Sequence, residues 1–274
     1  MSVRYHPPQH VTPALAQRIE RAEIEFCAAG AAAASAVAAT LEIGGGMAVV
    51  GATGSPLNKV LGLGIEALVT DADLDAIAAF YARRDDTAQI ELCPLAQAGL
   101  GERLIARGYT LKAFENEMAA TIQGSEVLMA GSGAAFGPFR ITLTSPLEDQ
   151  LWVDVVSDAF GGPALGTVMS QFVHPAITRY LVWADDQPAG GGATFLHDGI
   201  LGIFGTATLP EFRGRGVQTS LVRRCVADAQ GCADLAIATV DPGSTSQRTF
   251  ERLGFGVVYT RAIMSPCPGG ARSR

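Results

Sequence analysis

The sequence predicts an α/β (α+β) fold made of two mixed-sheet units that repeat a similar order of elements. Strand-like and helix-like segments alternate along the chain. A stretch rich in glycine and small residues, 123–138, separates two halves. Each half ends a helix with glycine and an aromatic residue, in Arg107-Gly108-Tyr109 and Leu253-Gly254-Phe255. We therefore expect domains over 1–122 and 139–274, joined by a linker over 123–138.

The first half begins with a well-marked helix. Thr12-Pro13 is typical of a helix start, because proline fits the first turn of a helix. Asp71 is expected to cap a second helix, and Gly44-Gly45-Gly46 predicts a hairpin turn. The predicted elements are a helix from 13, strands around 41–50 and 60–69, a helix from 71, a strand over 88–92 and a helix ending near 108.

The second half contains a longer series of elements. Ser145-Pro146-Leu147-Glu148 has the spacing of a capping box, with proline in the first turn. The predicted elements are strands over 139–143, 178–184, 189–196, 200–209, 235–240 and 257–264, and helices after 145, over 217–229 and ending near 254.

Composition excludes several classes of protein. The 274 residues carry a net charge of −7, so a surface that binds nucleic acid broadly is not expected. The five cysteines form no CxxC pair, which argues against a disulfide framework or a bound metal. The alanine-rich run 28–39 is too short to span a membrane and follows an acidic segment, unlike a signal peptide. We expect a cytoplasmic protein with no membrane partner.

The segment Arg213-Gly214-Arg215-Gly216-Val217-Gln218 is the most informative motif in the chain. Pro210 ends the preceding strand because proline has no N–H to donate. Two glycines allow successive N–H groups to point to one side, and the helix that follows begins with unpaired N–H groups. Residues 213–224 contain four arginines and no acid. The motif predicts a site for a pyrophosphate or another compact anion; the alternative is an ordinary glycine-rich turn with solvated arginines.

These residues resemble the GNAT superfamily of N-acetyltransferases. The family's phosphate-loop pattern is Gln or Arg, two residues, Gly, one residue, then Gly or Ala; Arg213, Gly216 and Gln218 occupy those positions, so glutamine replaces the last small residue. Leu253-Gly254-Phe255 matches the end of the family's fourth helix. The resemblance covers about residues 139–265. Residues 1–122 resemble a second, degenerate GNAT-like unit, and the whole is a tandem pseudo-repeat.

The resemblance implies that acetyl-CoA is the co-substrate and that no metal takes part. A primary amine of a small molecule would attack the thioester directly, in a ternary complex, while backbone N–H groups of the strand before the loop stabilise the oxyanion. The residues implied to bind the co-substrate are Thr206, Ala207, Thr208, Arg213, Gly214, Arg215, Gly216, Val217, Gln218 and Thr219.

The first half lacks such a loop. Thr70-Asp71-Ala72-Asp73-Leu74-Asp75 stands where the motif would fall, and three aspartates repel a pyrophosphate. We expect this half to pack against the catalytic half and to wall the acceptor pocket.

The residues for acid–base chemistry are less clearly marked. The tyrosine that many family members use as the acid is Phe250 here, and the usual asparagine near the start of that helix is absent. The candidates are Asp241 as a base acting through water and Ser246 as a donor to the leaving thiolate. Asp241 could instead have a structural role, in a turn or as a helix cap. Water could protonate the thiolate in place of Ser246.

Three functions fit these observations. The leading one is an acetyl-CoA-dependent N-acetyltransferase. A transferase for longer acyl groups requires a larger pocket, for which Gly190-Gly191-Gly192 is the candidate segment. A non-catalytic acyl-CoA-binding or sensing protein would explain Phe250. The sequence does not define the acceptor, and it leaves both a monomer and a homodimer open.

Overall fold

The computed structural model describes residues 10–34, 38–122 and 137–267. Residues 123–136 of the predicted linker lie outside the described residues. The chain divides into two compact units: unit 1 includes residues 118–257, and unit 2 includes residues 10–117 and the chain from 258 onward. Both units consist of mixed sheets with helices against them, which confirms the predicted fold class.

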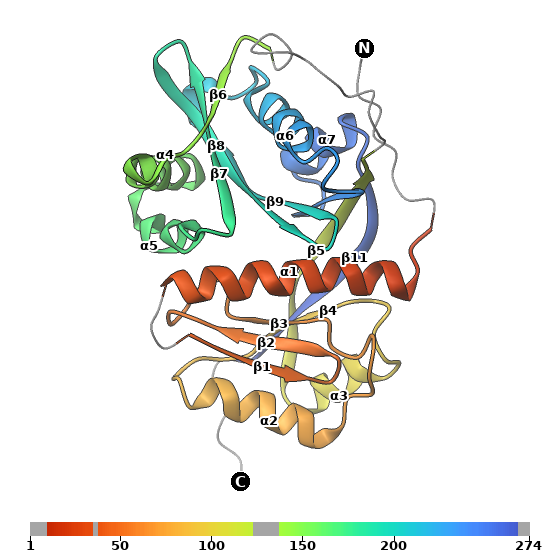
Figure 1. Ribbon diagram of the computed structural model, residues 1–274. Helices are drawn as coiled ribbons and strands as arrows, with labels where there is room; N and C mark the ends of the chain where they lie inside the picture. Colours follow the sequence, from red (N-terminus) through yellow and green to blue (C-terminus); the bar gives the residue numbers. More distant parts are fainter. Residues whose placement is uncertain (1–9, 35–37, 123–136, 268–274) are drawn as a thin grey trace. The chain divides into compact units, whose positions relative to one another are not determined.

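Unit 2 has helices on both faces of its sheet, with α1 along one face and α2 and α3 on the other (Figure 1). Its strands follow the order β1-β2-β3-β4-β11-β5. The elements are α1 (Pro13–Ala34), β1 (Ala39–Ile43), β2 (Gly46–Val50), β3 (Lys59–Leu61), α2 (Asp71–Ala82), β4 (Gln89–Leu92), α3 (Leu100–Ala106), β5 (Tyr109–Thr121) and β11 (Gly256–Pro266).

Two local predictions for unit 2 were wrong in detail. Thr70, not Asp71, caps α2: its hydroxyl accepts from the N–H of Asp73, whose carboxylate accepts from the N–H of Thr70. The predicted strand over 60–69 ends at Leu61. Beyond it the chain is held by loop hydrogen bonds, such as the 2.9 Å bond from the N–H of Gly64 to the carbonyl of Gly44. A short apolar run fits a buried loop as well as a strand.

The C-terminal strand does not follow the predicted domain boundary of 139–274. β11 pairs antiparallel with β4, with Ile263 opposite Glu91, and so completes the sheet of unit 2. β5, a strand that the sequence analysis did not predict, starts in unit 2, and its end from Met118 onward lies beside β10 in unit 1. Strand pairing joins residues far apart in sequence, so a local pattern does not reveal it.

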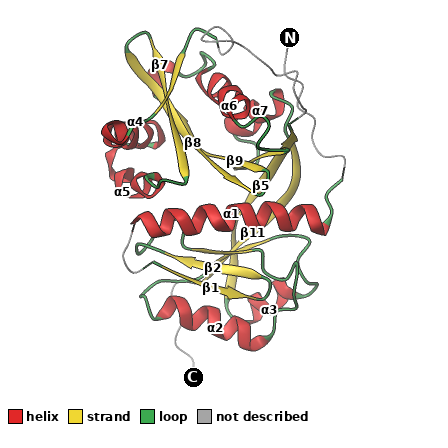
Figure 2. Cartoon of the chain, in the orientation of Figure 1, coloured by secondary structure: helices red, strands yellow, loops and turns green. Residues whose placement is uncertain are grey.

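Unit 1 contains the strands β5-β10-β9-β8-β7-β6 in that order. Helices α4 and α5 lie on one side of β7–β9, and α6 and α7 lie on the other (Figure 2). The further elements are β6 (Arg140–Leu143), α4 (Asp149–Phe160), α5 (Gly166–Met169), β7 (Ile177–Ala184), β8 (Gln187–His197), β9 (Ile200–Thr208), α6 (Val217–Asp228), β10 (Leu235–Val240) and α7 (Thr245–Arg252).

The predicted capping box is present before α4. The Ser145 hydroxyl accepts from the N–H of Glu148, and the Glu148 carboxylate accepts from the N–H of Ser145. The box opens one 3-10 turn, after which α4 packs on the sheet through the buried Trp152. The indole N–H of Trp152 bonds to the carbonyls of Tyr180 and Gly192. No helix in the described part of the chain is long and apolar enough to cross a bilayer.

Candidate functional site

The sheet of unit 1 opens at the carboxyl ends of β9 and β10. The two strands pair in parallel only as far as Gly202 and Ile237, although β9 continues to Thr208 and β10 to Val240. The register between β8 and β9 also shifts after Gly191, which marks a bulge in this part of β9. A bulge leaves backbone polar groups outside the ladder. The end of β9 is therefore available to hydrogen-bond with a ligand.

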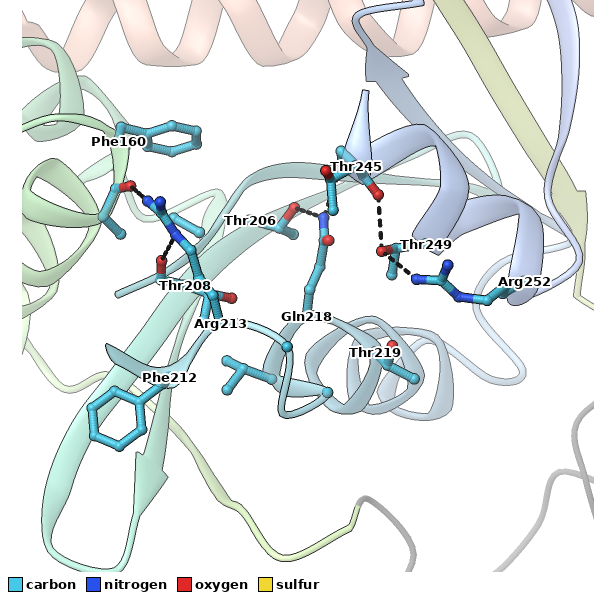
Figure 3. A pocket seen from close by; sticks show the side chains of 16 residues that line it. Phe160, Thr206, Thr208, Phe212, Arg213, Gln218, Thr219, Thr245, Thr249 and Arg252 are labelled. Carbon is cyan, nitrogen blue, oxygen red and sulfur yellow. Dashed lines mark hydrogen bonds between the residues drawn. The ribbon is translucent and has the colours of Figure 1, made fainter. Parts of the chain in front are cut away.

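A pocket of about 630 Å³, which we call the α6 pocket, lies at this opening (Figure 3). Its walls come from the end of β9, the loop before α6, the start of α6, one side of α7 and the end of α4. The lining residues are Ala159, Phe160, Thr206, Ala207, Thr208, Phe212, Arg213, Gly214, Gly216, Val217, Gln218, Thr219, Thr245, Ser246, Thr249 and Arg252. They include two arginines and no acid, in a chain of net charge −7.

The backbone of the loop before α6 forms an anion-binding surface. Gly214 and Gly216 adopt φ of 75° and 89°, a region in which side chains are strained. A Cβ built at either glycine meets nothing within 4 Å, so the space in front of the loop is open. No side chain of the described residues caps α6, and the N–H groups of its first turn lack a carbonyl one turn earlier. These groups carry the partial positive charge of the helix start.

Nine of the ten residues predicted to bind the co-substrate line the α6 pocket. Arg215 does not: its guanidinium lies 5.3 Å from the ring centroid of Phe212. Arg213 lines the pocket, and its exposed side chain also contacts protein, donating to the carbonyls of Thr208 (3.3 Å) and Ala159 (3.0 Å). The structure therefore gives Arg213 a bracing role.

The two predicted catalytic candidates lie in different surroundings. Ser246 lines the pocket, and its hydroxyl oxygen accepts a 2.9 Å bond from Nε2 of Gln218. Asp241 is exposed just after β10 and does not line the pocket. Phe250 is buried, with its ring centroid 4.9 Å from that of Phe255, so it belongs to the core.

Sequence reasoning identified Ser246 but missed three other residues of α7. Thr245, Thr249 and Arg252 all line the pocket. The hydroxyl of Thr249 donates to the carbonyl of Thr245 (3.0 Å) and accepts from Nη2 of Arg252 (3.1 Å). Their spacing of four and three residues places them on one helix face, away from the apolar Phe250 and Leu253. This amphipathic pattern is the feature of the sequence that could have identified the polar face of α7 as part of the site.

The three glycines of β8 do not enlarge the pocket. None of Gly190, Gly191 and Gly192 lines it. A Cβ at these positions would lie 2.3 Å from the Ala207 carbonyl oxygen, 2.9 Å from that of Tyr180 and 2.9 Å from a methyl of Leu221, respectively. The missing side chains permit close packing of strands and helices. The expectation that they create room for a longer acyl group was wrong.

The start of α2, the counterpart of α6 in unit 2, is closed by side chains. The Thr70 hydroxyl accepts from the N–H of Asp73, and the Asp73 carboxylate accepts from the N–H of Thr70. Asp71 pairs with Arg103 at 2.7 Å and with Arg107 at 3.3 Å, and these two arginines lower its carboxyl pKa. The Asp73 carboxylate therefore binds the N–H of the capping residue Thr70, and the Asp71 carboxylate pairs with two nearby arginines.

Comparisons with known proteins agree with this geometry. Residues 151–255 match the acetyltransferase (GNAT) family model. Among curated proteins no match was found. A GCN5-related N-acetyltransferase from Kribbella flavida is 20% identical, with a TM-score of 0.68 over 96% of this chain and 98% of that one.

Two further solved structures share the fold. A tandem GNAT protein from the clavulanic acid biosynthesis pathway is 12% identical, with a TM-score of 0.59 over 100% of both chains. A putative GNAT acetyltransferase from Novosphingobium aromaticivorans is 17% identical, with a TM-score of 0.54 over 84% of this chain and 91% of that one. Residues 151–255 therefore match an acetyltransferase (GNAT) domain, and the chain as a whole shares the fold of a tandem GNAT protein.

Proposed function

We propose that this protein transfers an acetyl group from acetyl-CoA to a primary amine of a small molecule. The family match supports acyl-CoA-dependent acyl transfer in general. The observation that carries the finer proposal is the α6 pocket, in which a helix start, an open strand edge and an acid-free lining meet.

The residues present fit a CoA pyrophosphate. The N–H groups from Gly214 to Thr219 face space that no Cβ would obstruct at either glycine. Arg252 adds a guanidinium at the α7 wall, opposite Arg213 across Gln218 (Figure 3). A polyphosphate is stabilised by such a combination of backbone donors and nearby cations.

The end of β9 suits the pantetheine arm. Thr206, Ala207 and Thr208 line the pocket where β9 has no β10 partner. An extended arm with two amides can hydrogen-bond to such an edge as a further strand does. In this arrangement the residues hold the thioester still, and an amine bound beside it attacks directly in the ternary complex. Backbone N–H groups of β9 then stabilise the oxyanion.

A non-catalytic acyl-CoA-binding protein is the second candidate. Phe250 has no hydroxyl to protonate a leaving thiolate, and none of the carboxylates in the described residues lines the α6 pocket. A protein without acid or base can still bind and sense the ligand. Both candidate functions require that acyl-CoA binds, but only the transferase releases CoA in the presence of an amine.

Calorimetric titration with acetyl-CoA, desulfo-CoA and ATP tests the proposal first. Acetyl-CoA and desulfo-CoA should bind, and ATP, which lacks pantetheine, should bind more weakly. CoA release should then be followed with a panel of small primary amines. Binding without turnover on any amine would favour the sensing protein, and failure of both CoA compounds to bind would overturn both candidates.

A further inference from the structure

One side chain connects two walls of the α6 pocket. Nε2 of Gln218, on the first turn of α6, donates to the hydroxyl oxygen of Thr206 on β9 (3.0 Å) and to that of Ser246 on α7 (2.9 Å). All three residues line the pocket. Figure 3 shows Gln218 extending from α6 between Thr206 and the start of α7.

The chemistry of these groups fixes the direction of the hydrogen bonds. An amide nitrogen carries two hydrogens and cannot accept, so each hydroxyl oxygen uses a lone pair to bind Gln218. The single hydrogen of each hydroxyl is left for another acceptor. Thr206 and Ser246 are therefore both arranged as donors within a pocket whose described lining residues include no carboxylate.

We propose that Gln218 is a positioning residue that directs the hydroxyl hydrogens of Ser246 and Thr206 towards bound acyl-CoA. The proposal rests on the proposed function of the pocket. Ser246 donates to the sulfur as the carbon–sulfur bond breaks and the electron pair moves onto it. Thr206 donates to a polar group of the pantetheine arm. Ser246 keeps its proton; the thiolate is protonated by water, which also receives the proton that the amine loses.

Three groups on α7 or just after β10 do not supply this interaction. The ring of Phe250 is buried and has no polar atom. Asp241 lies outside the pocket. The hydroxyl hydrogen of Thr249 is already committed to the carbonyl of Thr245. Ser246 is thus the pocket hydroxyl on α7 that an amide donor orients.

The test compares Gln218→Glu and Gln218→Met with the wild-type protein. A glutamate in place of Gln218 only accepts, so it draws both hydroxyl hydrogens away from the ligand. Methionine has similar length and leaves the hydroxyls free to rotate. Gln187→Glu is the matched control, because Gln187 is exposed at the first position of β8 and does not line the pocket. Thermal unfolding verifies that each variant folds.

The main readout is the ratio of the affinities for CoA and desulfo-CoA at about pH 9, above the ordinary pKa of a thiol. The ratio cancels any effect of the new charge on the phosphates. It should fall by roughly tenfold in Gln218→Glu, as expected for one lost charge-assisted hydrogen bond, and by less in Gln218→Met. Thiolate absorbance should show a higher pKa for the bound thiol in Gln218→Glu. Introducing Gln218→Glu into Ser246→Ala should change the ratio no further.

The outcomes separate this inference from the proposed function. If wild-type protein binds both ligands and Gln218→Glu weakens both equally, Gln218 has only a structural role and the inference is wrong. An unchanged thiol pKa would overturn it as well. If the wild-type protein binds neither CoA nor desulfo-CoA, the proposed function itself fails, and the inference fails with it.

Discussion

Nη2 of Arg213 donates a 3.0 Å hydrogen bond to the carbonyl oxygen of Ala159, which joins the loop before α6 to the last turn of α4. The guanidinium also contacts the Thr208 carbonyl at the end of β9. Carbonyls at a helix C-terminus carry partial negative charge, which favours an arginine there. One side chain therefore braces three elements that form the α6 pocket.

Arg213→Ala should weaken acetyl-CoA binding by about tenfold, because each lost hydrogen bond contributes about 1 kcal/mol to the position of the loop. Calorimetric titration measures the change. Arg223→Ala is the matched control, since it removes the same charge from an exposed position on α6 that does not line the pocket. Equal losses in the two variants would mean that charge, rather than bracing, explains the effect.

Gly216→Asp should abolish measurable acetyl-CoA binding while the protein remains folded. The substitution places a negative charge where the pyrophosphate is proposed to bind, and it strains a backbone with φ of 89°. Gly231→Asp adds the same charge at φ of 78° and also meets nothing within 4 Å, but Gly231 does not line the pocket. The control should lose similar stability and keep its affinity. Unchanged affinity in Gly216→Asp would refute the anion site.

Ser246→Ala should lower kcat by roughly tenfold with little change in KM for acetyl-CoA, because its hydroxyl is proposed to stabilise the departing thiolate. Asp241→Asn should change kcat less than twofold, since the Asp241 side chain is exposed outside the pocket. Steady-state kinetics with one accepted amine distinguishes the two. If kcat instead fell more in Asp241→Asn than in Ser246→Ala, Asp241 would be the base expected from the sequence.

Titration should give one acetyl-CoA per chain. The start of α2 in unit 2 is capped by Thr70 and Asp73, and Asp71 is paired with Arg103. The aspartates repel phosphate, and the Thr70 hydroxyl occupies the N–H of Asp73. Gly216→Asp provides the check, because any second site would retain binding of one ligand per chain in that variant.

Unit 2 buries an unusual set of charges between α1 and its sheet. Arg261 is fully buried, with Nε 2.8 Å from Glu20 and Nη1 2.5 Å from Glu23, and Lys59 lies 2.6 Å from Glu91. The charged and titratable groups of this cluster are Glu20, Glu23, Cys27, Lys59, Glu91, Glu115, Glu117, Tyr259 and Arg261. Carboxylates outnumber the two cations, so protonation of an acid relieves repulsion.

The stability of the protein should fall as pH rises from about 5 to 8. Burial and the neighbouring Glu91 raise the pKa of Glu115 to about 7, and burial raises the pKa of Glu20. The folded state therefore holds protons that the unfolded chain releases near its ordinary pKa, and this stabilisation is lost as pH rises through the folded pKa. Glu115→Gln should flatten the dependence and stabilise the protein at pH 8 by on the order of 1 kcal/mol.

Denaturant unfolding at several pH values measures this effect. Glu42→Gln is the matched control, because Glu42 is exposed on β1. A Glu115→Gln variant with the wild-type pH dependence would show that the Glu115 carboxyl does not hold a proton in the folded protein.

Several elements follow from local sequence because their determinants lie within a few residues. The capping box at Ser145 and Glu148 forms as its spacing indicates, and β10 has the predicted bounds of 235–240. The glycines and the helix start after Arg213 form the loop expected for an anion. Turn chemistry and hydrophobic periodicity are local properties, so a single chain reveals them.

Only the tertiary structure decided which distant residues meet. It assigned β11 to unit 2, turned the Arg213 guanidinium towards α4, and left Asp241 outside the pocket that contains Ser246. It also joined Gln218 to residues on β9 and α7. The strand pattern of β11 suits either sheet, and a polar side chain bonds to whichever partner the fold brings near. These outcomes depend on packing free energy summed over the whole molecule, which no short segment of sequence contains.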